Sequence, residues 1–513
     1  MALPDKDTMA AIAVTRFGLG ARPGELEAAK NDPKGWLKAQ ITRGAADQPP
    51  GEWPTSAERN IAYREAQQQR QQLQRAQGNA TPPGRPGAAA DMQTVQRQQL
   101  QQKLAPQPGQ PNMQQAQVAG DGAGLQEEFI GRAQLAASTD ASFRERWVLF
   151  WSNHFTVSAT KGQTRPLAGP FEREVIRPSA FGRFEDMLVL SSSHPAMLFY
   201  LDQAQSTGPN SPRARNAENA RLRARNPGQQ QQQQRIGLNE NLTREIMELH
   251  TVGVHGGYTQ NDVTEFARAM TGWSVGNPQD GAQNAKFIYR EQNHEPGDRT
   301  VMGKKYRDTG GTQALAIIKD LAAHPATARH IAQKLAVHFV SDDPPPSLVT
   351  KLEQAFITSK GDLNRVANAL VDADESWAPA QTKFKTPYEF IISAHRSLGV
   401  APLTTAPRPQ QGAQQMVLQP LQQMGQPPFA APSPKGWAED TGTWASPDGL
   451  IKRLNWSQVY APQVAMGPRE PMKVAQDALG KRLSNPTMLA LAAAESRPEA
   501  LTILFMSPEF QRR

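Results

Sequence analysis

The chain has 513 residues, a formal net charge of +8 and no cysteine. The absence of cysteine excludes disulfides, iron–sulfur clusters, cysteine-ligated zinc and cysteine nucleophiles. The basic excess suggests an acidic partner, but three low-complexity segments carry net charges of +4, +5 and +1, so the rest of the chain is slightly acidic. We therefore expect no specific binding of nucleic acid by the folded part.

Those segments are Ala66–Gly120, Gly208–Arg235 and Leu403–Met424, which are rich in Gln, Pro, Gly, Ala or Arg. Such compositions bury too little apolar area to offset chain entropy, so we expect three disordered insertions. The arginine-rich second insertion could still touch RNA, DNA or anionic lipid weakly. The remainder exceeds the roughly 250–300 residues that one core supports. We expect a single domain over residues 1–513, built of two helical lobes that meet at a cleft.

The chain shows neither a membrane span nor a targeting signal. Its longest apolar runs, such as Met488–Ala494, fall far short of the ~20 residues that cross a bilayer. The first residues, Met1–Thr8, lack the basic and apolar regions of a secretory signal and carry no lipid-anchor motif. The sequence thus indicates a cytoplasmic location by default, and export if a signal precedes the residues given.

Helical spacing of apolar residues recurs through most of the chain. Ser142–Phe155 places aromatic residues and His154 on one face, so we expect His154 to point inward. Gly237–Gly253 continues the pattern, and Thr259–Asp262 resembles a capping box that opens a helix ending at Gly272. Further helices are expected at Thr312–Ala323, Ala326–Val340, Ser347–Thr358, Leu363–Ala373, Pro387–Leu398, Asp448–Tyr460, Pro486–Ala493 and Pro498–Phe505.

One short β element is expected. Lys286–Tyr289 and Thr300–Met302 could pair as a small hairpin around the turn-rich Asn293–Asp298. No alternation of strands and helices indicates a parallel sheet. The sequence therefore predicts an all-α fold of many helices with at most one small β-hairpin.

The helix predicted at Gly237–Gly253 carries the best candidate site. Taking 100° per residue from Leu238, Asn241, Glu245 and Glu248 fall at about 300°, 340° and 280°, along one edge of the apolar stripe. Two carboxylates one turn apart could bind a divalent cation or form an acid/base pair with split pKa values.

The alternative is an ordinary ion-paired helix surface, in which Arg244 or Arg268 neutralises these carboxylates. His250 lies on the far side of the helix from Glu248, which argues against a joint metal site. We interpret His250 as a packing residue.

Two more histidines are candidates. An inward-facing His154 needs a hydrogen-bond partner, so it is either a satisfied core residue or part of a site that Asn153 also lines. His294 offers ligands together with Glu295 and Asp298 in one loop, although the same residues form ordinary turns. His294 is therefore a metal candidate beside Glu245 and Glu248.

Other cofactor and ligand signals are few. The chain lacks a phosphate loop, a dinucleotide fingerprint, a nucleophile elbow and the HExxH zinc motif, so no nucleotide or haem cofactor is indicated. Trp437 and Trp444 lie in the Gly- and Pro-rich stretch Pro427–Asp448, where they could stack on a ligand or pin the loop to the core.

Several motifs carry a resemblance to a known family. Asn239–Gly253, Tyr258–Val263 and Ala267–Trp273 form a distinctive run that resembles the DUF1800 family of bacterial proteins. Nearly the whole chain outside the low-complexity segments is similar to that family. The other matching segments are Arg16–Gly24, Leu149–Phe155, Pro195–Asp202, His294–Gly303, Lys334–Asp343, Lys385–Phe390, Gly425–Pro428, Gly436–Trp437 and Ser507–Phe510.

The resemblance implies a mostly helical fold but supplies no reaction. It also implies an association with DUF1501 proteins, which resemble sulfatases and alkaline phosphatases and are often encoded beside DUF1800 members. Two classes of function follow. One is a cleft enzyme, hydrolase-like and with or without a divalent metal, that uses His154, Asn241, Glu245, Glu248 and Arg268. The other is a non-catalytic partner of a DUF1501-type protein.

Overall fold

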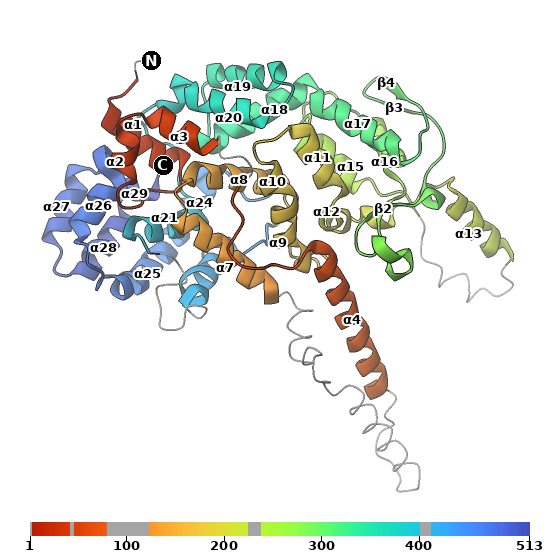
Figure 1. Ribbon diagram of the computed structural model, residues 1–513, viewed down its shortest axis with the longest axis horizontal. Helices are drawn as coiled ribbons and strands as arrows, with labels where there is room; N and C mark the ends of the chain where they lie inside the picture. The colour runs from red at the N-terminus through yellow and green to blue at the C-terminus, as the bar shows by residue number, and fades with distance from the viewer. Residues whose placement is uncertain (1–2, 42–45, 79–122, 224–236, 401–411) are drawn as a thin grey trace, which may run out of the picture.

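The computed structural model describes residues 3–41, 46–78, 123–223, 237–400 and 412–513 (Figure 1). Helices account for 66% of it. The strands of the described residues form two small two-stranded sheets. The fold is therefore all-α, as the sequence predicts. No helix in this part of the chain combines the length and the apolar character that a membrane span needs.

The N-terminal helices begin with α1 (Lys6–Ile12), which Asp5 caps by accepting a hydrogen bond from the Thr8 amide at 2.9 Å. The chain continues as a π-helical turn, η1 (Ala13–Phe17), and both elements bury apolar residues. The next helices are α2 (Glu25–Lys30), α3 (Pro33–Ile41) and α4 (Ser56–Gly78).

Helix α4 extends away from the body of the molecule (Figure 1). Its first turns are anchored by Ser56, whose amide and hydroxyl both donate to Glu174 at 2.7 Å, and by an Arg59–Glu128 ion pair of 2.6 Å. The insertion expected at residues 66–120 therefore begins inside a helix, because Gln, Arg and Ala favour helix continuation. Residues 79–120 lie outside the described part of the chain.

Helix α8 (Ser142–His154) follows α7 (Ala123–Ser138) in the chain, runs through the middle of the molecule and packs against α3 and η1 (Figure 1). Trp147 and Trp151 are fully buried, and so are the charged side chains of Arg144, Glu145 and Arg146. A helix buried on nearly all sides must pair its charges internally. The following short elements are η2 (Arg165–Leu167), α9 (Ala168–Phe171), η3 (Glu172–Ile176) and α10 (Arg177–Ser179).

The region expected to be disordered at residues 208–235 also starts with ordered structure. Asn210 donates to Glu295 from its amide and its side chain, both at 2.6 Å, and α13 (Pro212–Arg223) follows. Residues 224–235 lie outside the described part. The preceding elements are α11 (Phe184–Ser193), α12 (Pro195–Tyr200) and η4 (Gln203–Gln205).

The helix expected at Gly237–Gly253 is shorter than predicted and changes its winding. It begins as α15 (Asn241–Glu245) and continues as a π-helix, η5 (Ile246–His250). The capping box of the next helix is confirmed: in α16 (Gln260–Met270), Thr259 and Asp262 bond each other's backbone amides. The 100° step therefore does not apply after Glu245, since a π-turn holds more residues than an α-turn.

Two hairpins replace the single one predicted. β1 (Trp273–Val275) pairs with β2 (Phe287–Tyr289), and β3 (Arg299–Val301) pairs with β4 (Lys304–Tyr306), both antiparallel. The predicted pairing across residues 293–298 was wrong because Met302 and Gly303, both with positive φ, reverse the chain at once. The short helices η6 (Pro278–Gln283) and η7 (Glu291–Asn293) flank β2.

The next helices agree with the predicted ones to within one or two residues. They are α17 (Gly311–Ala323), α18 (Pro325–Phe339), α19 (Pro346–Thr358), α20 (Leu363–Asp372) and α21 (Pro387–Leu398). Except for α17, these helices start at prolines or capping side chains, such as Thr386, whose hydroxyl accepts a hydrogen bond from the Glu389 amide. A short helix that was not predicted, η8 (Asp374–Trp377), lies between α20 and α21.

The described part of the linker expected at residues 403–424 is largely helical. Its second half forms η10 (Gln414–Leu418) and α23 (Gln419–Gln423), and Val417 and Leu421 are fully buried. Residues 403–411 lie outside the described part. The C-terminal elements are α24 (Thr441–Trp444), α25 (Pro447–Val464), α26 (Pro471–Leu479), η11 (Gly480–Arg482), α27 (Asn485–Ala493), α28 (Arg497–Met506) and α29 (Pro508–Gln511).

Two large hydrophobic cores hold these elements together. One joins apolar residues of α1, α3, α8 and the elements from α9 to η8. The other joins α7 with α21 and the C-terminal helices, which lie together at one end of the molecule (Figure 1). Leu149 of α8 packs on the second core, whereas Trp147 belongs to the first.

Candidate functional site

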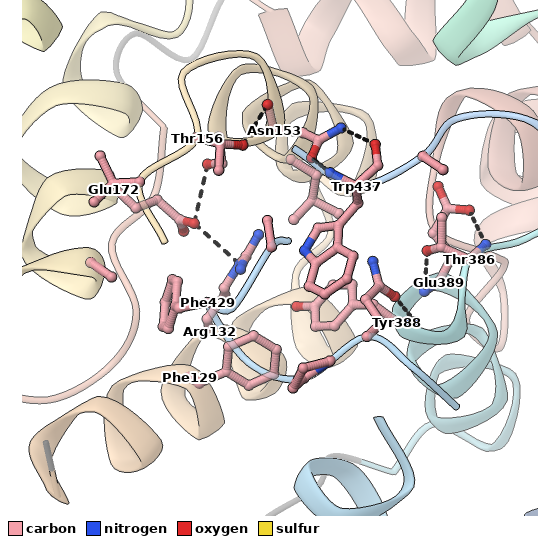
Figure 2. A pocket seen from close by; sticks show the side chains of 18 of the residues that line it. Phe129, Arg132, Asn153, Thr156, Glu172, Thr386, Tyr388, Glu389, Phe429 and Trp437 are labelled. Carbon is pink, nitrogen blue, oxygen red and sulfur yellow. Dashed lines mark hydrogen bonds and ion pairs between the residues drawn. The ribbon is translucent and has the colours of Figure 1, made fainter. Parts of the chain in front are cut away.

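A cavity of about 110 Å³ lies between the two cores, beside the C-terminal half of α8 (Figure 2). Helices α7, α9, α18 and α21 and the segment 426–439 complete its walls. Aromatic side chains form much of the lining: Phe129, Phe171, Tyr388, Phe429 and Trp437. The charged and polar lining residues are Arg132, Ser152, Asn153, Thr156, Glu172, His338, Thr386, Glu389, Gln426 and Glu439.

Asn153, at the end of α8, holds one wall in place (Figure 2). Its Nδ2 donates to the Trp437 carbonyl at 3.0 Å and to Glu439 Oε1 at 3.2 Å, while its Oδ1 accepts from the Trp437 amide at 2.7 Å. Gly436 adopts φ +86°, and a Cβ there would lie 2.5 Å from Asn153 Oδ1. The close approach of this loop to α8 therefore requires glycine.

His338, the second-last residue of α18, pairs with Glu439 at the cavity wall. Its Nδ1–H donates to the carboxylate, lying 3.0 Å from both oxygens. Among the described residues, Nε2 of His338 is buried without a hydrogen-bond partner. Burial lowers the pKa of His338 despite the opposing carboxylate, and Arg513 and Arg146 add to the lowering. The imidazole is therefore neutral at pH 7, with its lone pair on Nε2.

Glu439 is ionised beside that imidazole. Burial works to raise its pKa, but His338, Lys383 and Arg513 together lower the pKa to about 2. Lys383 also donates to the Glu439 carbonyl and pairs with Asp342 at 2.6 Å. A carboxylate that stays charged next to a neutral histidine orients the ring and stabilises the imidazolium when it forms.

A second ion-pair network lies on the same side of α8. Arg146 pairs with Glu389 Oε1 at 2.5 Å, and Arg513 reaches Oε2 of the same carboxylate at 3.2 Å. Burial acts to raise the pKa of Glu389, but the two guanidinium groups hold it at about 2. Two buried cations therefore share the Glu389 carboxylate, and Arg513 also acts on the ionised Glu439.

Arg177 organises the opposite wall. It contacts Glu145 and Glu172, each at 2.7 Å from Nη2. Glu172 also accepts from Ser152 at 3.1 Å and lies 3.3 Å from Nε of Arg132. Burial acts to raise the pKa of Glu172, but Arg132 and Arg177 together lower that pKa by more, so the carboxylate is ionised. These two arginines and two glutamates balance in charge.

The predicted carboxylates Glu245 and Glu248 lie elsewhere, on α15 and η5, and neither lines the cavity. Both are half-buried. Tyr258 donates to Glu248 at 3.4 Å, and burial followed by the charge of Glu248 raises the pKa of Glu245. Asn241 is exposed, and its backbone N–H donates to Asn239 Oδ1 at 2.8 Å. No hydrogen bond within the described residues joins the Asn241 side chain to either glutamate.

The two arginines expected to neutralise these carboxylates pair with other residues. Arg244 contacts Glu240 at 3.1 Å and Gln260 at 2.9 Å. Arg268 forms an ion pair with Glu265, its neighbour on α16. Within the described residues, no ion pair joins either arginine to Glu245 or Glu248.

His154 points inward, as predicted, into a cluster with His250, His330 and Lys334. Its Nε2–H donates to the His250 carbonyl at 3.1 Å, and the His154 and His330 rings lie 6.4 Å apart. Burial lowers the pKa of His250 to about 3, of His330 to about 4 and of Lys334 to about 8. His250 packs against Phe155, and no hydrogen bond among the described residues joins His154 to Glu245 or Glu248.

In the loop containing His294, His294 and Glu295 are buried, whereas Asp298 is exposed. His294 donates to the Thr271 carbonyl at 3.1 Å, and Glu295 accepts from Asn210. Asp298 pairs instead with Lys305 at 3.0 Å. The three side chains bind different partners because β3 and β4 fold back on the loop. Across the described ranges, no group of three or more His, Asp or Glu residues is arranged to hold a metal ion.

Trp437 and Trp444 occupy different positions, one at the cavity and one in the core. Trp437 is partly exposed and lines the cavity, whereas Trp444 is buried and donates to the Ala438 carbonyl at 2.8 Å. One therefore faces any bound ligand and the other holds the loop to the core.

Sequence reasoning missed His338, Glu439, Arg132 and Glu172 as site residues. A signal existed for His338, since His330, Lys334 and His338 stand at i, i+4 and i+8 on one face of α18. A second signal is that five segments resembling the DUF1800 family line the cavity: Leu149–Phe155, Lys334–Asp343, Lys385–Phe390, Gly425–Pro428 and Gly436–Trp437.

Comparisons with known proteins identify the family but no individual relative. No curated protein and no solved structure matches the chain. The family described as "Protein of unknown function (DUF1800)" matches residues 12–512, nearly the whole chain. The chain therefore belongs to the DUF1800 family.

Proposed function

We propose that the protein is a cleft enzyme that hydrolyses an ester or amide bond in the cavity beside α8. The observation that carries this proposal is the His338–Glu439 pair at the cavity wall, in which the carboxylate accepts a hydrogen bond from Nδ1–H and Nε2 is buried without a hydrogen-bond partner among the described residues. This arrangement of carboxylate and imidazole is that of a general base.

The proposed step uses water as the nucleophile. Nε2 of His338 takes one proton from a water molecule while the water oxygen forms a bond to the substrate's carbonyl carbon. The imidazolium then gives that proton to the leaving oxygen or nitrogen as its bond to carbon breaks. Glu439, ionised throughout, stabilises the imidazolium between the two transfers.

Hydrolysis of 4-nitrophenyl acetate and of the 4-nitrophenyl monoester of succinate tests this proposal. We expect His338→Gln and Glu439→Gln to lower kcat at least ~100-fold, the lower end of what a general base contributes. His255→Gln, the same substitution at an exposed loop position, is the control and should leave kcat unchanged. Equal rates for the native protein and His338→Gln would refute the proposal.

A second candidate site is the pair Glu245 and Glu248. It is supported by the raised pKa of Glu245, which burial and the charge of Glu248 cause against the smaller opposing effect of Arg244. Among the described residues, Arg244 and Arg268 form their ion pairs with Glu240 and Glu265 instead. The pair Glu245 and Glu248 could act as acid and base. Loss of the basic or acidic limb of the pH–rate profile in Glu245→Gln, with His338 intact, would assign the chemistry here.

The non-catalytic alternative is docking to a DUF1501-type protein. It is supported by the solvent-facing side of α25, where Ile451 and Val459 are 58% and 57% exposed. A pull-down with the purified DUF1501-type protein tests it. Ile451→Ser and Val459→Ser should weaken capture if this surface binds, while the hydrolysis assay should be unaffected.

A further inference from the structure

Arg132 is held in a cage of three aromatic rings at the cavity wall (Figure 2). Its Cζ atom lies 5.5 Å from the ring centre of Phe129, 5.3 Å from that of Tyr388 and 5.5 Å from that of Phe429. Rings at this distance attract a cation and restrict its movement. The guanidinium is therefore fixed in place before any ligand arrives.

Much of the hydrogen-bonding capacity of this guanidinium is unused. Glu172 approaches only the Nε edge, at 3.3 Å, because its other oxygen is bound by Arg177. No hydrogen bond within the described residues engages the two Nη groups of Arg132. A guanidinium carries five N–H donors, so a free fork remains at the cavity wall.

A second unpartnered group lies in the same wall. The hydroxyl of Tyr388 is buried, and it has no hydrogen-bond partner in the described part of the chain. Buried hydroxyl groups are normally hydrogen-bonded, and an unsatisfied one calls for an explanation. Tyr388 also forms part of the Arg132 cage, so both unsatisfied groups lie at one place.

We propose that the ligand of this cavity carries a carboxylate group, which the Nη fork of Arg132 binds while the Tyr388 hydroxyl donates a third hydrogen bond. The planar fork matches the two oxygens of a carboxylate. The substrate class rests on the hydrolytic function proposed above: an ester or amide that bears a free carboxylate.

The walls and the surrounding charges restrict the rest of the ligand. Phe129, Phe429 and Trp437 offer apolar surface to an aromatic or branched body. Arg132 and Glu172 already balance in charge with their neighbours.

Calorimetric titration with benzoate tests the proposal. Benzamide serves as the neutral probe of the same shape and inorganic phosphate as the non-planar anion. We expect benzoate to bind and both other probes to bind at least tenfold more weakly. Arg132→Gln should weaken benzoate at least tenfold, whereas Arg183→Gln, at an arginine remote from the cavity, should not change its affinity.

Tyr388→Phe provides a milder variant that keeps the ring of the cage and removes only the hydroxyl. It should weaken benzoate several-fold, and it decides the matter if Arg132→Gln does not fold. Equal affinities for benzoate and benzamide, or unchanged affinity in Tyr388→Phe, would overturn the assignment of a carboxylate.

The binding and turnover measurements separate this inference from the proposed function. Benzoate that binds through Arg132 in a protein that hydrolyses neither ester would support the carboxylate site and refute the hydrolase. Hydrolysis that depends on His338 but is not inhibited by benzoate, with no preference for the succinate ester, would support the hydrolase and refute the carboxylate ligand.

Discussion

Replacing Gly436 by alanine tests whether the loop carrying Trp437 and Glu439 must lie against α8. The added Cβ would lie 2.5 Å from Asn153 Oδ1, 2.6 Å from the Asn153 carbonyl oxygen and 2.8 Å from Thr156 Oγ1. One of these neighbours is backbone and cannot rotate away. The loop must therefore move outward, taking Glu439 from His338.

Two costs contribute to the destabilisation. The left-handed conformation of Gly436, φ +86°, costs a non-glycine residue about 1–2 kcal/mol. Forcing a methyl group into a filled space costs a further ~1–3 kcal/mol. Gly425→Ala isolates the first cost, because Gly425 has φ +82° and an added Cβ would meet no atom within 4 Å.

Urea unfolding followed by circular dichroism measures the free energy of unfolding of both variants. Equal slopes of that free energy against urea concentration allow the two midpoints to be compared directly. We expect Gly436→Ala to lose about 1–3 kcal/mol more than Gly425→Ala, the share due to crowding alone. Gly436→Ala should also bind benzoate more weakly, since its loop forms part of the cavity. Equal losses in the two variants would show that the contact with Asn153 is not tight, and the reasoning would fail.

Three further predictions concern buried charges. Arg177→Met leaves two buried glutamates without their shared cation and should cost about 3–5 kcal/mol in chemical unfolding; a loss below ~1 kcal/mol would contradict the pairing. Glu439 has a folded pKa of about 2, below its ordinary value of 4.5, so its stabilisation is present above pH 4.5 and disappears as the pH falls through 2. Glu439→Gln should therefore flatten the loss of stability in acid, and unchanged pH curves would refute this. Because folding raises the pKa of Glu245, the ionised carboxylate destabilises the folded protein at pH values above that pKa. The double variant Glu245→Gln with Glu248→Gln should therefore be as stable as the native protein, or slightly more stable, at pH 7. A marked fall in its melting temperature would indicate ion pairs instead.

Local sequence patterns determined the helices of this protein. The capping box at Thr259–Asp262 and the inward face of α8 follow from residues a few positions apart, and both were predicted. The helices α4 and α13, which extend into the low-complexity segments, were missed. Their Gln, Ala and Arg residues favour a helix, but they show no periodic apolar pattern from which a helix could be predicted. The β3–β4 hairpin was missed because the prediction paired strands across residues 293–298, whereas β3 reverses into β4 through the two-residue turn Met302–Gly303.

The candidate site could be found only in part. The motif segments and Trp437 indicated where the lining residues lie in the sequence, but not that they meet. Glu245 and Glu248 drew attention because a helix places them together locally, whereas the π-turn that follows Glu245 alters that face.

Tertiary structure alone decided which charges meet. His338 pairs with Glu439, about a hundred residues later in the chain, and Arg132 meets Glu172 on another helix. Helical periodicity reports which side of an element is buried, and it carries no information on which distant side chain shares that burial. The cavity lies where α8 passes between the two cores. Burying an unpaired charge is costly, so the charged side chains that line the cavity must each meet an opposite charge from a distant part of the chain.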